Sequence, residues 1–216
     1  MAPAERAKPG VRIATVSQSV SQSGDMEGFS MAVIAEDLRM AALQGLGVSE
    51  PLMRLAAGEC IHDAFRGRCL GPPFHVYHRA GVPTGPPLVP LWDSGDMVFG
   101  VWDKADALEF IEFSIEAPEE FELVAKTEQG FWAARFDFLY ECDLPDEDLQ
   151  SAAASVGFRF LTRQLASREE AGERLDTFQG HRAWLRELVA EIDRDVRQHQ
   201  ENPSGFRRAL HPSALS

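Results

Sequence analysis

The sequence is short of cysteine, of long apolar runs and of basic residues. Its three cysteines, Cys60, Cys69 and Cys142, are few and odd in number for 216 residues, which argues against the disulfide framework of a small secreted protein and predicts reduced, intracellular thiols. No segment approaches the roughly 20 apolar residues of a membrane span, and the N-terminal region has no apolar run of signal-peptide length. We therefore expect a cytoplasmic protein without a membrane partner.

Motifs for nucleotide binding, metal binding and catalysis are also missing. The glycine-containing turns GVPTGPP and DSGD match neither the phosphate-binding pattern G-x4-G-K-[ST] nor G-x-G-x-x-G after a strand. The densest group of potential metal ligands lacks the compact pairs that zinc sites use. It comprises Cys60, His62, Asp63, Cys69, His75 and His78. The sequence therefore predicts no cofactor, no bound metal and no catalytic residue.

Acidic residues outnumber basic ones, and the excess is concentrated in one region. The chain carries 34 acidic and 21 basic residues, for a formal net charge of -13. Between Lys104 and Asp148 there are fourteen acidic residues and only three basic ones, a local balance of -11. A field of this sign repels phosphate backbones, so it argues against nucleic acid and favours a basic protein partner. The alternative interpretation is a solvated acidic surface.

Composition and local patterns divide the chain into four parts. With 44% hydrophobic and 25% charged residues, most of the chain is expected to fold. Residues 1–27 combine an alternating VRIATV stretch with a Ser/Gln run, and are interpreted as a flexible leader or a weak edge strand. Residues 28–143 are expected to form an α+β domain with a mainly antiparallel central sheet flanked by helices. A helical extension over residues 144–202 and a tail over residues 203–216 follow.

The first half of the α+β domain contains two helix signals and then many turn residues. The spacing of apolar residues predicts a helix from Gly28 to about Leu46, and Ser49 is the expected cap of a second, short helix. Proline and glycine are dense from Gly67 onward, which predicts short strands joined by turns, HVYH among them. The last of these turns, over residues 93–96, is expected to close a hairpin.

The second half of the domain is predicted to contain a strand and a long helix. LEFIEFSIEA alternates apolar and acidic residues, so one face of this strand should be buried and the other acidic, with a bulge at Phe110 and Ile111. Pro118 is predicted to open a helix with three glutamates in its first turn, running to about Glu141. Gly130 is expected to weaken the middle of that helix.

The C-terminal region is rich in helix-forming residues, and arginine becomes its common basic residue. An amphipathic helix is predicted there, because four large apolar residues recur at a four-residue step: Trp184, Leu188, Ile192 and Val196. The apolar stripe is expected to pack on the sheet domain or on another subunit.

This order of elements resembles the SUKH superfamily over about residues 46–141. The resemblance is carried by the proline-hydrophobic-tryptophan entry at residues 90–92 and by the closing helix, with Ala125 and the aromatic spacing of Phe131 and Phe136. Members of the superfamily include bacterial immunity proteins against polymorphic toxins and a fungal cell-wall regulator. The resemblance implies a cytoplasmic protein without enzymatic activity that binds its partner through a sheet face or cleft.

The sequence thus favours a non-enzymatic protein-binding module, and the resemblance implies one of the immunity type. The acidic residues expected to attract a basic partner or toxin domain are Asp93, Asp96, Glu109, Glu112, Glu116, Glu119 and Glu120. Trp92 and Trp102 are the expected apolar anchors, with core packing as their alternative role. Two other functions stay open: a hydrolase with a site around His75, His78 and Asp93, and an assembly subunit that oligomerises through the Trp184 helix.

Overall fold

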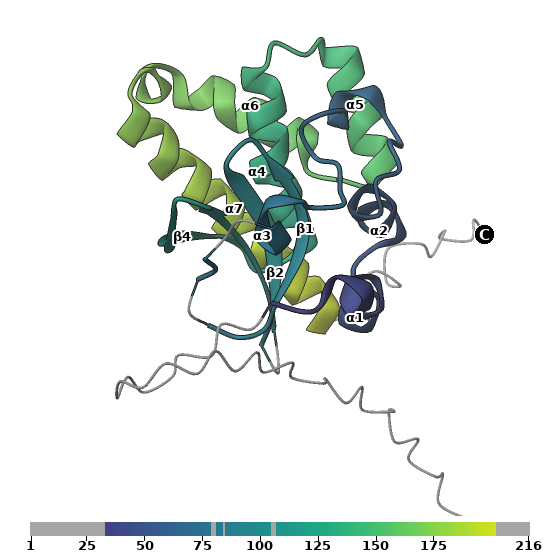
Figure 1. Cartoon of the computed structure of the whole chain (residues 1–216). Helices are drawn as coiled ribbons and strands as arrows, with labels where there is room; N and C mark the ends of the chain where they lie inside the picture. Colours follow the sequence, from purple (N-terminus) through teal and green to yellow (C-terminus); the bar gives the residue numbers. More distant parts are fainter. Residues whose placement is uncertain (1–32, 79–80, 84, 105–106, 202–216) are drawn as a thin grey trace, which may run out of the picture.

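The computed structural model describes residues 33–78, 81–83, 85–104 and 107–201. A four-stranded antiparallel sheet forms its centre, with several helices behind the sheet and a short helical segment in front of it (Figure 1). The strands follow chain order and are β1 (Leu88–Ser94), β2 (Met97–Lys104), β3 (Ala107–Ser114) and β4 (Ala117–Ala125). The predicted α+β class with an antiparallel sheet is confirmed. The leader and the tail that the sequence suggested, residues 1–27 and 203–216, lie outside the described residues.

The hairpin and bulge predictions are confirmed. Ser94 pairs with Met97 across the β1–β2 turn, where Gly95 has a φ of 63°, a left-handed conformation that suits glycine. The register of β3 against β4 shifts between Phe110 and Ile111, so the bulge lies where the apolar alternation breaks.

The helix predicted to begin at Pro118 is wrong in its first half. Residues 117–125 form strand β4, which pairs with β3, and helix α4 (Glu128–Glu141) begins only after Thr127. The Thr127 hydroxyl accepts a hydrogen bond from the backbone N–H of Gly130 at 3.1 Å and so caps the helix. Pairing with β3 stabilises the extended conformation, and this tertiary contact outweighs the local helix-start signal of Pro118 and its glutamates.

The elements before the sheet agree with the sequence only in part. Ser49 caps its helix as predicted, accepting from the backbone N–H of Leu52 at 3.3 Å. HVYH is a short helix rather than a strand, and residue 33 forms a bridge with β1, so the predicted first helix starts later than expected. The elements are η1 (Glu36–Leu38), α1 (Arg39–Leu46), α2 (Glu50–Ala56), η2 (Asp63–Phe65) and α3 (His75–His78).

The C-terminal helices pack onto the sheet within this chain. They are α5 (Asp146–Val156), α6 (Leu161–Ala171), the 3-10 turn η3 (Gly172–Asp176) and α7 (Phe178–Glu201). The predicted apolar stripe of α7 is buried against α4 and β4, with Trp184 4% and Ile192 0% exposed. Because the stripe is covered by its own chain, it is not a surface left for a second subunit. Among the described residues, no helix is long and apolar enough to cross a membrane.

Two apolar clusters cover the two faces of the sheet. The larger joins the helix-side face, including Trp92 and Phe110, to residues of α4 and α7. The smaller lies on the other face, where Trp102, Ile111 and Phe113 pack with residues of α3 and the following loop. Both faces of β3 are therefore buried, and the predicted acidic face of this strand is wrong. Its glutamates lie at the margins of the two clusters.

Candidate functional site

The two tryptophans expected to anchor a partner are core residues. Trp92 is fully buried and its ring lies 5.7 Å from that of Phe131. Trp102 is 4% exposed and contacts the ring of Phe121 at 4.8 Å in an edge-on arrangement. Neither side chain reaches the surface in this structure, so the alternative interpretation of core packing describes both of them.

Asp93 has a structural partner. Its Oδ2 accepts hydrogen bonds from the backbone N–H groups of Phe74 and His75 at 2.7 and 2.6 Å, which places the carboxylate at the start of α3. The His78 ring stacks on Phe74 with centroids 4.2 Å apart. The structure thus brings the predicted residues together through backbone groups and not as a His/Asp pair. No three His, Cys, Asp or Glu side chains of the described chain are placed to hold a metal ion.

Glu109 and Glu112 lie on opposite faces of β3. Glu109 is paired across the sheet with a residue of the smaller cluster and forms an ion pair with Lys104 at 2.5 Å. Glu112 is on the helix side, where its carboxylate contacts Arg135 of α4 at 2.9 Å. These two glutamates therefore cannot act together on one partner surface, and each already has a basic neighbour.

Four of the seven predicted acidic residues remain exposed beside one another. The β1–β2 and β3–β4 turns meet at the same end of the sheet, where the backbone N–H of Ile115 donates to the carbonyl of Asp96 at 2.9 Å. Glu116 lies in the second turn, and the chain continues from it into β4. We call this surface the acidic strip; it consists of Asp96, Glu116, Glu119 and Glu120.

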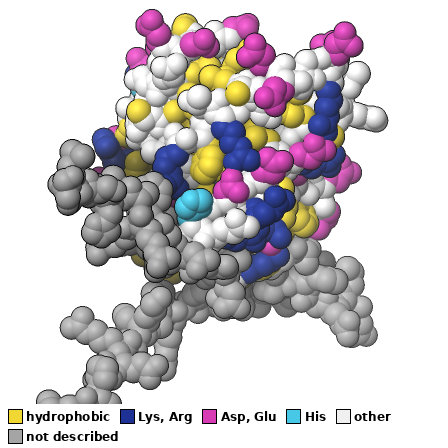
Figure 2. All heavy atoms as spheres, turned by 180° about the vertical axis from the view of Figure 1, so that it is seen from behind, with side chains coloured by type: hydrophobic (Ala, Val, Ile, Leu, Met, Phe, Trp, Pro, Cys, Tyr) yellow, Lys and Arg dark blue, Asp and Glu magenta, His cyan; other side chains and the backbone are white. Residues whose placement is uncertain are grey.

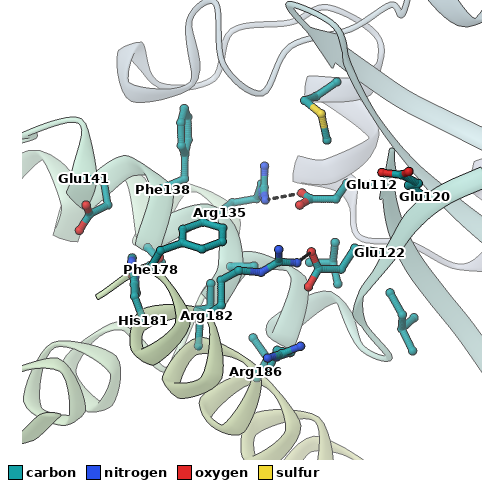
Figure 3. A pocket seen from close by; sticks show the side chains of 17 residues that line it. Glu112, Glu120, Glu122, Arg135, Phe138, Glu141, Phe178, His181, Arg182 and Arg186 are labelled. Carbon is teal, nitrogen blue, oxygen red and sulfur yellow. Dashed lines mark hydrogen bonds and ion pairs between the residues drawn. The ribbon is translucent and has the colours of Figure 1, made fainter. Parts of the chain in front are cut away.

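A groove of about 550 Å³ lies beside the acidic strip, between β4, α4 and α7 (Figure 3). Two large aromatic side chains on its walls are exposed to solvent, Phe138 at 40% and Phe178 at 74%. Phe178 is the first residue of α7 and lies outside the buried stripe of that helix. In Figure 2, which views the molecule from behind, apolar side chains are interspersed with charges of both signs.

Arginines neutralise much of the acidic region around the groove. Arg135 pairs with Glu112, and Arg182 of α7 pairs with Glu122 of β4, as the dashed lines in Figure 3 show. Arg168 of α6 contacts Glu141 at the end of α4. The local charge of -11 that the sequence shows is therefore partly compensated in space, because residues far along the chain supply the missing cations.

A buried carboxylate beside the groove connects α4, α6 and α7. Asp137 of α4 is 4% exposed and accepts hydrogen bonds from Arg168 at 2.6 Å and from His181 Nε2 of α7 at 2.9 Å. Burial raises the pKa of Asp137, whereas the hydrogen bond from His181 and the charge of Arg168 oppose that rise. These three residues are widely separated in sequence, and no local motif marks them.

The lining of the groove combines apolar and charged side chains. Its described lining contains no serine, threonine or cysteine that could attack a substrate. The ring nitrogen Nε2 of His181 is engaged with Asp137. The walls instead offer aromatic and aliphatic surface next to paired and unpaired charges. A comparison with protein-family models, with curated proteins and with solved structures finds no match for this chain.

Proposed function

We propose that this chain is a protein-binding module that holds its partner over the groove and the acidic strip. The observation that carries the proposal is the exposure of Phe138 and Phe178 around one groove. Aromatic side chains are enriched among the residues that contribute most to protein–protein affinity. Exposed apolar surface rimmed by polar groups marks interaction sites on proteins.

The charges around the groove define the rim of the interface. Glu112, Glu122 and Asp137 already have arginine partners within the chain, so they contribute shape and hydrogen-bonding capacity more than net attraction. The acidic strip is different, because Asp96, Glu116 and Glu120 form no ion pair with another described residue. A basic patch on the partner would face the strip, which would raise the association rate more than the final affinity.

The resemblance of residues 46–141 to the SUKH superfamily supports one class of partner. An immunity-type protein occupies the surface of a toxin domain in a stoichiometric complex and blocks it without chemistry. The acidic strip and the aromatic groove would together cover a basic toxin surface in that way. This assignment of the partner depends on the resemblance, whereas the binding surface is argued from the exposed residues themselves.

The test is capture of a partner from a lysate of the source cells, followed by binding measurements with the purified partner. A groove variant, Phe138→Glu with Phe178→Glu, should weaken binding about 30-fold or more, because it removes the apolar anchors. A strip variant, Asp96→Lys with Glu116→Lys and Glu120→Lys, should slow association and reduce its salt dependence.

The control is a charge reversal of equal size on a distant helix. Asp146→Lys with Glu147→Lys and Asp148→Lys changes three exposed acidic residues at the start of α5, away from the groove. This variant should bind like the wild type, and thermal unfolding should show that all variants are folded. Equal affinity of the groove variant and the wild type would overturn the proposal, as would recovery of the protein alone while a known complex survives the same washes.

A further inference from the structure

Two charged residues on the walls of the groove have no ion-pair partner in the described part of the chain. Glu120 belongs to β4 and Arg186 to α7, so these charges of opposite sign lie on different walls (Figure 3). Neither takes part in the ion pairs that the described residues form with one another. An occupant with a base near Glu120 and an acid near Arg186 would complete both pairs.

The other carboxylates of the groove are already neutralised by their own chain. Those that contact an arginine are Glu112, Glu122, Asp137 and Glu141. Because each has a basic neighbour, they attract a further base only weakly. The lining also has no concentration of positive charge that would hold a phosphate group. The two unpaired residues therefore decide which charges a fitting occupant presents.

Arg135 places hydrogen-bond donors in the lining of the groove. It is 9% exposed, and its guanidinium carbon lies 4.3 Å from the centroid of the Phe99 ring. Its Nη2 donates to Glu112 at 2.9 Å, whereas its Nε is buried and has no acceptor among the described residues. A buried donor without an acceptor is unfavourable. A backbone carbonyl bound beside the guanidinium would supply an acceptor, and such carbonyls are free in an extended segment but occupied inside a helix.

The apolar part of the lining fits a large side chain. Phe138 and Phe178 are the exposed aromatic residues of the groove, and the guanidinium of Arg182 lies 5.4 Å from the centroid of the Phe178 ring. The volume of about 550 Å³ is in the range of roughly 300–1,000 Å³ found for ligand pockets. A groove of this size receives a short segment of chain, whereas a flat surface of a folded partner would leave its interior empty.

We propose that the groove binds an extended peptide segment of the partner, in which a large apolar residue is accompanied by a basic residue on the β4 side and an acidic residue on the α7 side. This inference rests on the proposed function, since it names the part of the partner that enters the groove. The apolar side chain covers Phe138 and Phe178. The base faces Glu120, the acid faces Arg186, and a backbone carbonyl accepts from Arg135.

Selection from a peptide library tests the inference without knowledge of the partner. The probe is a phage-displayed library of random linear peptides of about 12 residues, long enough for an extended segment or a helix to be selected. The purified full chain is the target, and the variant Phe138→Glu with Phe178→Glu removes peptides that bind elsewhere. Enriched sequences should share a large apolar, a basic and an acidic residue at fixed spacing, and should tolerate proline. A lack of enrichment over the variant would overturn the inference.

Charge exchange between peptide and protein tests the two pairs. Arg186→Glu should weaken binding of a selected peptide about fivefold, and lysine in place of the acidic residue of the peptide should restore it. Glu120→Lys should act in the same way on the basic residue. Arg194→Glu is the matched control, because Arg194 is an exposed residue of α7 outside the groove lining. Fluorescence anisotropy of labelled peptides measures the affinities, and equal binding to the wild type and to Arg186→Glu would contradict the pairing.

Two other occupants of the groove would be recognised by their own results, and either would overturn the inference. Selected peptides with apolar residues three and four positions apart and no proline would show a helical occupant. A concentration-dependent dimer in analytical ultracentrifugation, lost in Phe138→Glu with Phe178→Glu, would show a second copy of this chain. The proposed function is judged separately by the captured partner. If the groove variant loses that partner but no peptide is selected, a folded surface binds there and only the present inference fails.

Discussion

The two edges of the sheet differ in how their backbone groups are covered. At the β1 edge, the buried Arg39 guanidinium donates to the carbonyls of Pro90 and Leu91, both at 3.2 Å, and to that of Ala56 at 2.9 Å. Gly71 approaches this edge so closely that a Cβ atom there would lie 2.8 Å from the Leu91 carbonyl oxygen. At the β4 edge, residues 119–121 and 123 are exposed.

The β1 edge is covered by contacts that stabilise the fold, whereas several side chains of β4 are exposed to solvent. A covered edge needs a donor for each outward carbonyl, and Arg39 supplies that donor at the cost of burying a charged group. An exposed edge keeps its backbone hydrated, costs little, and stays available to another strand or a partner. The groove and the acidic strip, which we propose for recognition, both adjoin β4.

The largest difference in stability between the two edges is expected when one leucine in each edge strand is replaced by alanine. Leu91→Ala in β1 removes a fully buried side chain and should lower the free energy of unfolding by about 2–5 kcal/mol. Leu123→Ala in β4 removes a side chain that is 40% exposed and should cost about 1 kcal/mol or less. Urea unfolding of both variants measures the difference. Similar losses at the two sites would contradict the assignment of β4 as the open edge.

Substitution of Arg39 tests how much its hydrogen bonds to the backbone carbonyls at the β1 edge stabilise the protein. Arg39→Met preserves the length of the side chain but leaves three backbone carbonyls without their donor, so the free energy of unfolding should fall by about 3 kcal/mol. Arg54→Met on the neighbouring helix α2 is the control, because Arg54 forms an exposed ion pair with Glu59, and such pairs contribute little. A loss no greater in Arg39→Met than in the control would show that the buried guanidinium does not hold this edge.

Asp193 anchors β4 where the strand leaves the sheet, and Gly130 tests that anchor. Asp193 of α7 accepts from the backbone N–H of Lys126 at 2.7 Å and from the Thr127 hydroxyl at 2.6 Å. A Cβ atom at Gly130 would lie 2.3 Å from Asp193 Oδ1, so Gly130→Ala must displace the carboxylate. We expect a loss of about 2 kcal/mol in the free energy of unfolding, despite the better helix propensity of alanine.

Gly45 provides the matched control for that substitution. It lies within α1, and nothing outside its local helix backbone is within 4 Å of a Cβ atom built there. Gly45→Ala should therefore be neutral or stabilise the protein by up to about 1 kcal/mol. If both alanine variants were stabilised alike, Asp193 would not be fixed against α4, and the end of β4 would have another anchor.

Local signals in the sequence were sufficient for those elements whose stabilising contacts are also local. The Ser49 cap, the β1–β2 hairpin and the apolar stripe of α7 each depend on residues within a few positions of one another, and each is confirmed. Gly130 was interpreted as a weak point of a long helix. In the structure it lies in the first turn of α4, where the close approach of Asp193 requires a residue without a side chain.

Contacts between distant residues account for what the sequence did not show. Pro118 and its glutamates satisfy the pattern of a helix start, yet pairing with β3 makes this segment a strand. The hydrogen bonds of Asp137 to Arg168 and His181 join residues 31 and 44 positions apart, so no spacing rule finds them. The hydrophobic pattern identified Trp92 and Trp102 as important but not whether they face solvent, because both faces of the sheet are covered.

The smallest expected effect concerns pH, because Arg39, which covers β1, and Asp193, which anchors β4, respond differently to acid. Burial lowers the pKa of Arg39, but an arginine stays protonated throughout this range. Burial raises the pKa of Asp193, although its hydrogen bonds from Thr127 and Lys126 oppose the rise. The anchor of β4 should therefore respond to pH, and the covering of β1 should not.

The direction of that response follows from proton linkage. Between the ordinary pKa of an aspartate and the raised pKa of folded Asp193, the native state binds a proton that the unfolded state has lost, so stability falls as pH rises. The free energy of unfolding of the wild type minus that of Asp193→Asn should therefore be larger near pH 4 than at pH 7, whereas the difference between wild type and Arg39→Met should stay constant. Urea unfolding at both pH values measures the two differences. A larger advantage of the wild type over Asp193→Asn at pH 7 would mean that its hydrogen bonds outweigh burial, and that the end of β4 is held by a charge the protein stabilises.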